Sequence, residues 1–136
     1  MTDSFQLEIV TPEKMVVKDV VEEMQIPGKD GYLGILPGHA PLITELAVGE
    51  ITYRKAGQTH YLSMAWGFAE VLPDKVTILA ETAERPQDID VKRAQESKQR
   101  AEEALKTGKT EEDFTRAEDS LKRAETRLDV AGRSQN

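Results

Sequence analysis

Two histidines and two rows of arginines are the side chains in this sequence whose spacing could support chemistry or binding. Arg93 and Arg100 are seven residues apart, and a second row, at steps of seven and four, comprises Arg116, Arg123 and Arg127. On a helix these steps place side chains on one face. Guanidinium groups repel one another unless an anion or carboxylates lie between them, and their planar forks suit phosphate oxygens. The spacing predicts either an anion-binding surface or a solvated face with helical ion pairs such as Asp119 with Arg123.

His39 and His60 favour neither a metal site nor a catalytic site. A metal site needs further ligands at suitable spacing, and no carboxylate cluster accompanies either histidine. The chain has no cysteine, no serine in a G-x-S-x-G turn, no P-loop and no Gly-rich dinucleotide fingerprint. We therefore expect no metal and interpret His39 as a structural or interface residue. A small hydrolase that uses either histidine stays an alternative, and it predicts turnover that mutation of that histidine abolishes.

Composition restricts the class of partner. The net charge is −7, which argues against nucleic-acid binding, because that binding relies on Lys and Arg to displace counterions from phosphates. The longest apolar runs fall far short of the roughly 20 residues that a membrane span needs, and MTDSFQLEIV has no basic region typical of a signal peptide. The absence of cysteine is compatible with a reducing compartment. These features predict a cytoplasmic protein that meets a membrane only through a partner.

The chain divides into two parts of unlike composition, and we predict domains at residues 1–86 and 87–136. In the first, Phe5, Leu7 and Ile9 alternate with polar residues, as in a half-buried strand. Strands of about five residues with turns every eight to twelve predict a β-sandwich or a barrel. Its expected core includes the following apolar residues: Leu7, Ile9, Leu62, Met64, Phe68, Val71, Val76 and Ile78.

The second part predicts two helices. Asp88 or Asp90 can cap the first, whose apolar seam comprises Val91, Ala94, Ala101 and Leu105. Gly108 suits a left-handed helix end, and Thr110 with Asp113 resembles a capping box. The second seam consists of Phe114, Ala117, Leu121, Ala124, Leu128 and Ala131. Because alanine buries little area, we expect this hairpin to be marginal alone and to depend on docking elsewhere.

Four motifs carry a resemblance to a known family. They are L-E-I-V-T-P, G-Y-L-G-I-L-P-G-H-A-P-L-I-T, W-G-F-A-E-V-L-P-D-K-V-T-I-L-A and D-I-D-V-K-R-A, in this order. The chain resembles the epsilon subunits of bacterial F-type ATP synthases along nearly its whole length. One departure is Trp66, where many relatives have a small residue.

The resemblance implies an α+β fold in two parts, an N-terminal two-sheet antiparallel β-sandwich followed by a C-terminal α-helical hairpin. It implies a non-catalytic, peripheral subunit at the cytoplasmic face of the bacterial inner membrane. Expected partners are the gamma subunit, the c-ring and the catalytic alpha and beta subunits. The expected contacts with the c-ring and gamma are Lys29, Asp30, Gly31, Tyr32, Leu33, Pro37, His39 and Pro41. Prolines in this loop lower the entropy lost when it docks.

The resemblance also implies regulation. In this family the hairpin either folds against the sandwich or extends along gamma and inhibits ATP hydrolysis, and some members bind ATP through the motif I/L-D-x-x-R-A. No cofactor is expected to be required, and ATP is expected as a regulatory ligand. Its predicted site comprises Glu84, Ile89, Asp90, Arg93, Ala94, Arg100, Arg123 and Arg127. The alternative is a free-standing β-sandwich adaptor whose hairpin binds another acidic protein.

Overall fold

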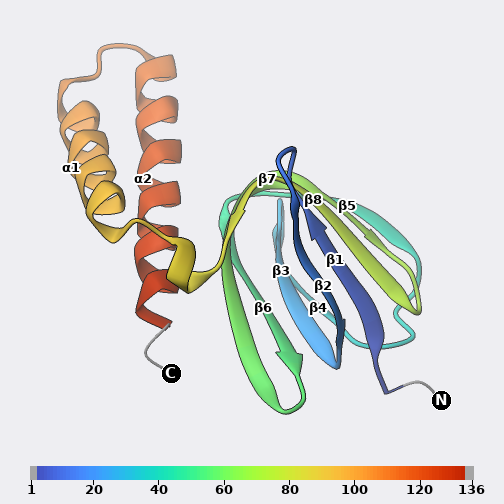
Figure 1. The fold of residues 1–136 in the computed structure, drawn as a ribbon. Helices are drawn as coiled ribbons and strands as arrows, with labels where there is room; N and C mark the ends of the chain where they lie inside the picture. Colours follow the sequence, from blue (N-terminus) through green and yellow to red (C-terminus); the bar gives the residue numbers. More distant parts are fainter. Residues whose placement is uncertain (1–2, 134–136) are drawn as a thin grey trace.

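The computed structural model describes residues 3–133, which form a strand-rich body followed by a helical hairpin (Figure 1). The strands are β1 (Phe5–Val10), β2 (Met15–Val21), β3 (Glu23–Gly28), β4 (Gly31–Ile35), β5 (Leu42–Leu46), β6 (Gly49–Lys55), β7 (Gln58–Val71) and β8 (Lys75–Glu84). A 3-10 turn, η1 (Pro86–Asp88), leads to α1 (Val91–Thr107) and α2 (Glu111–Gly132). The predicted fold class, a β-sandwich followed by a helical hairpin, is confirmed. None of the helices described is long and apolar enough to cross a membrane.

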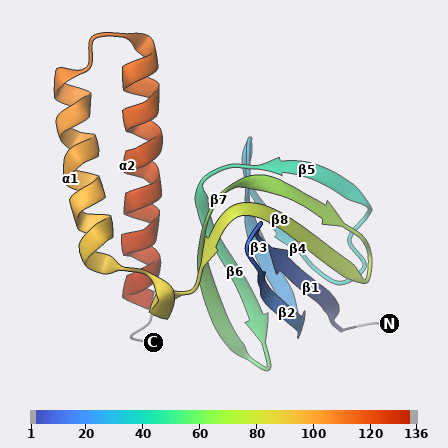
Figure 2. The same cartoon turned by 45° about the horizontal axis from the view of Figure 1, so that its top comes forward.

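The strands pair in the order β2-β1-β8-β7-β5-β3-β4, and β6 pairs with both β3 and β7. Every pair is antiparallel except β1 with β8, which is parallel. The 14-residue strand β7 belongs to both layers, because residues 58–64 pair with β6 and residues 67–71 pair with β5. This long strand arches over the body (Figure 2). Its bend is therefore the point at which the two layers of the sandwich are joined.

The bend of β7 lies at Trp66 and Gly67. Trp66 has a φ of 51°, a left-handed conformation that is costly for a bulky residue. A Cβ atom on Gly67 would lie well inside contact distance of the Leu79 carbonyl oxygen and 3.0 Å from Ala80 Cα. Only glycine permits so close an approach of two backbones.

The core agrees with the predicted set at every position except Phe68. Seven of the eight predicted side chains are at most 1% exposed, whereas Phe68 is 55% exposed. Leu62 and Met64 point inward, and strict alternation would place residue 68 inward as well. The irregular residue at the bend shifts the alternation by one, so that Ala69 and Val71 are buried instead and Phe68 faces outward.

At the ends of α1, the predicted cap at Asp90 is confirmed and the predicted left-handed conformation of Gly108 is wrong. Asp90 caps α1 by accepting a hydrogen bond of 3.0 Å from the Arg93 N–H. Gly108, however, has a φ of −61° and is not left-handed. The chain goes directly into the extended cap of α2, and the Gly108 N–H still donates to Ala104 O. Glycine fits here because a Cβ would meet that oxygen at 3.0 Å.

The helical seams are made by alanines. Ala94, Ala101, Ala117 and Ala124 are buried between the helices, as predicted. The first members of the predicted seams, Val91 and Phe114, are 43% and 38% exposed. They lie in the first turn of each helix. The seam is therefore shorter than the sequence pattern suggests.

The predicted capping box is present, and it gives a testable pH dependence. Asp113 N–H donates to Thr110 Oγ1, and Asp113 Oδ2 accepts from the N–H groups of Lys109 and Thr110. These hydrogen bonds hold the pKa of Asp113 below its ordinary value of 3.8, and the bond from Lys109 has the largest effect. A carboxyl whose pKa is depressed by folding stabilises the folded state only when it is ionised. Its contribution is therefore complete above the pKa of the unfolded state and is lost as pH falls through the pKa of the folded state.

We therefore expect the helicity of the native chain to fall more steeply below pH 3.8 than that of the Asp113→Asn variant. Circular dichroism as a function of pH measures this difference, and NMR titration of the carboxyl measures the pKa itself. Asp129→Asn, an exposed position near the other end of α2, is the matched control. A pKa for Asp113 at or above the ordinary value would contradict the role of the capping box.

Candidate functional site

Helix α2 lies between α1 and the sandwich (Figures 1 and 2). Polar side chains of α2 contact the strands. Trp66 Nε1 donates to Asp119 Oδ1 at 3.0 Å. Arg123 Nε lies 2.8 Å from Asp119 Oδ2, and its Nη2 lies 4.0 Å from Glu81. The Nε of Arg123 is buried and has no hydrogen-bond partner among the described residues, so its contact with Asp119 is an ion pair.

The bend of β7 explains why Trp66 and Glu81 face the helix. The pairing of β7 with β8 passes from Ala65 with Thr82 to Gly67 with Ala80, and thus omits the residues between them. Such irregular positions redirect side chains away from the regular alternation of a strand. The unpaired Trp66 and Glu81 both reach α2. The bend therefore forms part of the docking surface for the hairpin.

Two further ion pairs lie along α2. Arg127 Nε donates to Glu84 Oε1 at 2.6 Å, and the two side chains are 28% and 33% exposed. Arg133 lies 3.3 Å from Glu50 and sits over the Tyr61 ring at 5.0 Å. Val130, near the end of the same helix, is fully buried. The docking surface is thus largely polar, with few apolar anchors.

The structure brings only part of the predicted ATP site together. Glu84 and Arg127 are in direct contact, and Arg123 lies one turn before Arg127 on α2. A cleft of about 330 Å³ beside them is lined by Lys14, Glu81, Glu84, Asp88 and Arg127, among others. Ile89 and Ala94 are buried, Asp90 is the cap of α1, and Arg93 is exposed.

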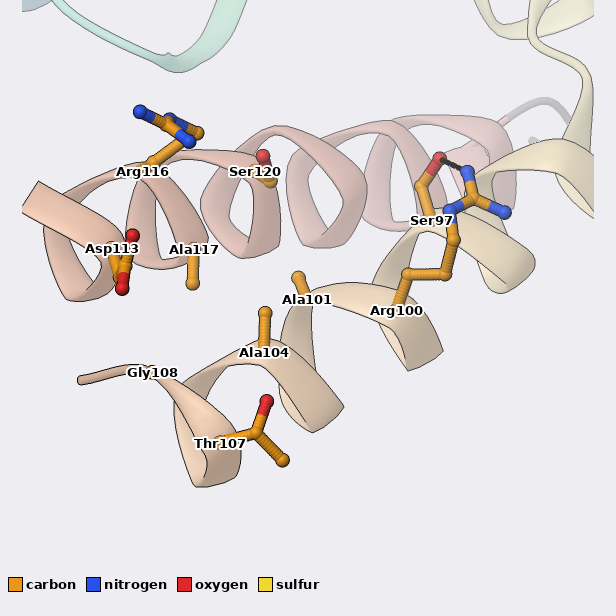
Figure 3. A pocket seen from close by; sticks show the side chains of 10 residues that line it. All are labelled: Ser97, Arg100, Ala101, Ala104, Thr107, Gly108, Asp113, Arg116, Ala117 and Ser120. Atoms are coloured by element: carbon orange, nitrogen blue, oxygen red, sulfur yellow. Dashed lines mark hydrogen bonds between the residues drawn. The ribbon is translucent and has the colours of Figure 1, made fainter.

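Arg100 lines a different hollow, a groove of about 420 Å³ between α1 and α2 (Figure 3). There its Nη2 donates to Ser97 Oγ at 3.0 Å. Arg116 lines the same groove but lies at the other end, beside Asp113 (Figure 3). These two guanidinium groups therefore do not converge on one point in the docked hairpin.

The predicted interface loops are exposed and held in shape by local bonds. Tyr32 is 57% exposed, and its hydroxyl accepts from the Glu50 N–H at 2.9 Å. Lys29 forms an ion pair of 3.4 Å with Glu45. His39 Nδ1 lies 2.7 Å from Ala40 O, so this nitrogen carries the proton and donates. His39 thus has a local structural contact, and Pro37 and Pro41 flank it.

Sequence reasoning missed an apolar strip on the outer face of β5, β7 and β8. Ile43, Phe68 and Leu79 are 74%, 55% and 55% exposed. Phe68 pairs with Leu79 on one side and with Glu45 on the other, and Ile43 lies two residues from Glu45 on the same face. The prediction that Phe68 lies in the core is wrong, because its side chain faces outward beyond the bend. Trp66 and Gly67 were the only local signal of that bend.

Among the described residues no group of three or more His, Cys, Asp or Glu side chains could hold a metal ion. The fold and contacts define a two-part protein in which a helical hairpin docks on a β-sandwich. Residues 4–86 match the family model described as the β-sandwich domain of the ATP synthase delta/epsilon chain, and residues 87–132 match its long α-helix domain. The chain belongs to the ATP synthase delta/epsilon chain family.

Relatives and solved structures agree with this assignment. The chain is 74% identical over 107 residues to the ATP synthase epsilon chain of Koribacter versatilis, covering 79% of this chain and 75% of that one. It is 44% identical over 135 residues to the epsilon chain of Geobacter sulfurreducens, covering 98% of each. A chain in the Euglena gracilis mitochondrial ATP synthase structure (OSCP/F1/c-ring) has the same fold, with a TM-score of 0.82 at 21% identity, covering 96% of this chain and 82% of that chain. The resemblance to epsilon subunits is confirmed.

Proposed function

We propose that this chain is a non-catalytic subunit of the central stalk of a proton-translocating F-type ATP synthase, linking gamma to the c-ring. Its hairpin, when released from the sandwich, inhibits ATP hydrolysis by the catalytic alpha and beta subunits. It acts peripherally at the cytoplasmic face of the bacterial inner membrane. The observation that carries this proposal is the polar docking surface of α2, which holds the hairpin by a few partly exposed ion pairs.

The energetics of this surface support a movable hairpin. Partly exposed ion pairs each contribute about 0–1 kcal/mol, and the alanine seams bury little apolar area. The sandwich, by contrast, has a continuous core of fully buried Leu, Ile and Val side chains. Release of α2 would therefore leave the sandwich folded. A continuous helix of about 45 residues would reach roughly 68 Å, about twice the length of the folded hairpin.

ATP is proposed to favour the docked hairpin through Glu84, Asp90, Arg93, Arg123 and Arg127, with Ile89, Ala94 and Arg100 beside them. In the structure Arg127 and Arg123 are paired with carboxylates. Phosphate groups would therefore have to exchange with Glu84 or Asp119 as partners of these guanidinium groups. Because only the docked form assembles both sides of this site, bound ATP would shift the population toward it.

The sandwich is proposed to bind gamma and the c-ring through its exposed loops and the apolar strip of Ile43, Phe68 and Leu79. The loop residues are those predicted above: Lys29, Asp30, Gly31, Tyr32, Leu33, Pro37, His39 and Pro41. Apolar side chains so exposed on adjacent strands are typical of protein interfaces. Local bonds such as that from Glu50 to Tyr32 reduce the ordering cost of docking.

ATP titration of the isolated chain tests this function. With one dye on the sandwich and one at Leu128, we expect millimolar ATP to increase the fraction of molecules with a short inter-dye distance. Arg127→Ala should weaken this response at least tenfold, because it removes a guanidinium at the docking surface. Arg116→Ala, an exposed arginine of α2 outside the proposed site, should respond like the native chain.

Reconstitution separates the regulatory part from the stalk function. Removal of residues 87–136 should raise the ATP hydrolysis rate of the assembled enzyme while leaving binding of the sandwich to gamma intact. No distance change with ATP would remove the nucleotide-sensing role alone. Failure of the native chain to bind gamma would remove the stalk function as a whole.

A further inference from the structure

Another pocket lies at the junction of the sandwich, the linker and the end of α2. It has a volume of about 420 Å³ and is lined by the first residues of β7, by the linker after β8 and by the residue that follows α2. The lining includes the polar side chains of Gln58, His60, Tyr61, Arg85, Gln87 and Arg133. We propose that this pocket is a binding site for a small oxyanion of the phosphate class.

The charge of the lining favours an anion. The chain as a whole has 25 acidic and 18 basic residues, yet none of the described residues that line this pocket is acidic. Arg85 and Arg133 supply two guanidinium groups, and His60, Gln58 and Gln87 supply further donors. Guanidinium forks match phosphate oxygens in shape and charge. An oxyanion in this pocket would therefore meet donors without a carboxylate in the lining.

Arg85 is already held in position. Its Nη1 donates to the Tyr53 hydroxyl at 3.3 Å and its Nη2 to Val16 O at 3.4 Å. Tyr53 is only 2% exposed, and the His60 ring stacks on it at 5.0 Å. A guanidinium has five N–H donors, so these two bonds leave others for a ligand. These long bonds orient the side chain before binding, so part of the entropy cost of ordering it is already met.

Arg133 can contribute by exchanging a weak partner. Its Nη2 and Nε lie 3.3 and 3.4 Å from the Glu50 carboxylate, longer than the roughly 2.7–2.9 Å of a strong charge-assisted bond. The guanidinium also lies over the Tyr61 ring, at 5.0 Å from its centroid. These contacts keep the positive charge at the edge of the pocket. An oxyanion with better geometry would then compete with Glu50 for Arg133.

This pocket is distinct from the proposed ATP site. Glu84 and Arg85 are consecutive residues at the end of β8, where extended backbone directs neighbouring side chains to opposite faces. Accordingly Glu84 contacts Arg127, whereas Arg85 contacts Tyr53. The cleft beside Arg127 and the pocket around Arg85 share no lining residue. Binding at one site therefore does not require occupation of the other.

The pocket is complete only while α2 is docked, because Arg133 follows α2 whereas Arg85 and His60 belong to the sandwich and the linker. A bound oxyanion would thus add to the stability of the docked hairpin. This consequence rests on the hairpin release proposed above. The binding itself does not, since it needs only the docked structure.

The test is a titration of the full chain, followed by NMR signals of arginine and histidine side chains. Inorganic phosphate and methyl phosphate are the two probes, and sodium chloride at equal ionic strength is the reference. We expect saturable shifts at His60, Arg85 and Arg133 with phosphate but not with chloride. Saturation by both phosphates would indicate a phosphoryl group as the ligand, whereas saturation by inorganic phosphate alone would indicate the free ion.

Variants distinguish this site from surface binding. Arg85→Gln and Arg133→Gln should each weaken phosphate binding at least tenfold, and Arg54→Gln, an exposed arginine outside the pocket, should leave it unchanged. If the circular dichroism spectrum shows that Arg85→Gln is unfolded, phosphate binding is compared in Arg133→Gln and His60→Gln instead. Shifts that equal those of chloride, or that survive both Arg133→Gln and His60→Gln, would overturn the proposal. Arg93→Ala changes an exposed residue of the proposed ATP site and should retain phosphate binding even if the ATP response fails.

Discussion

Replacing Gly67 by alanine will destabilise the sandwich more than alanine at any other glycine of its strands. The added Cβ would overlap the Leu79 carbonyl oxygen and lie 3.0 Å from Ala80 Cα. Both are backbone atoms, which cannot rotate away, so β7 and β8 must separate. We expect a loss of about 3 kcal/mol in the free energy of unfolding, measured from the urea midpoint at an unchanged slope.

Gly34→Ala is the matched control for this experiment. Gly34 lies in β4, and a Cβ built on it has no heavy atom within 4 Å. The substitution should therefore change the free energy of unfolding by no more than about 0.5 kcal/mol. Equal stability of the two variants would show that the close approach at Gly67 relaxes without cost.

Replacing Trp66 by phenylalanine will release the hairpin more readily while leaving the sandwich folded. The change keeps an aromatic ring but removes the indole N–H that donates to Asp119 at 3.0 Å. Hydrogen bonds to charged groups contribute about 1.5–3 kcal/mol. We therefore expect at least a tenfold increase in the opening equilibrium of α2, measured by hydrogen exchange of its amides near Asp119 and Arg123, whose side chains contact the strands.

A double-mutant cycle isolates this contact. Asp119→Asn should weaken docking by itself, because Asp119 also neutralises Arg123. Combining it with Trp66→Phe should cost less than the sum of the two single changes, since both remove the same bond. Glu118→Gln, at an exposed neighbouring position, should leave exchange unchanged. Strict additivity of Trp66→Phe and Asp119→Asn would exclude a direct contribution of the bond.

The same residue offers an intrinsic reporter. Trp66 is the single tryptophan of the chain, and it lies at the contact between the sandwich and α2. Its emission should therefore change when the hairpin leaves, with no added dye. Together the effects expected at Gly67 and Trp66 separate two roles of one bend. Gly67 holds the layers of the sandwich together, and Trp66 holds the hairpin.

Local pattern in the sequence determined most of the secondary structure. Alternation of Phe5, Leu7 and Ile9 predicted β1, and the steps of three and four among alanines predicted both helices. Thr110 and Asp113 predicted a capping box that the structure contains. These features depend on neighbouring residues and on the hydrogen bonds of one turn. Sequence alone therefore suffices for them.

Only the tertiary structure decided which way Phe68 points and which partners the arginines have. The alternation of inward and outward side chains changes at Trp66 because β7 lies close to β8 at Gly67, and the alternation of apolar residues does not report that crossing. Likewise, the seven-residue spacing of arginines indicated a shared face but not that Arg127 would meet Glu84, 43 residues earlier. Spacing along one helix sets the direction of a side chain, whereas its partner depends on which strand the helix packs against.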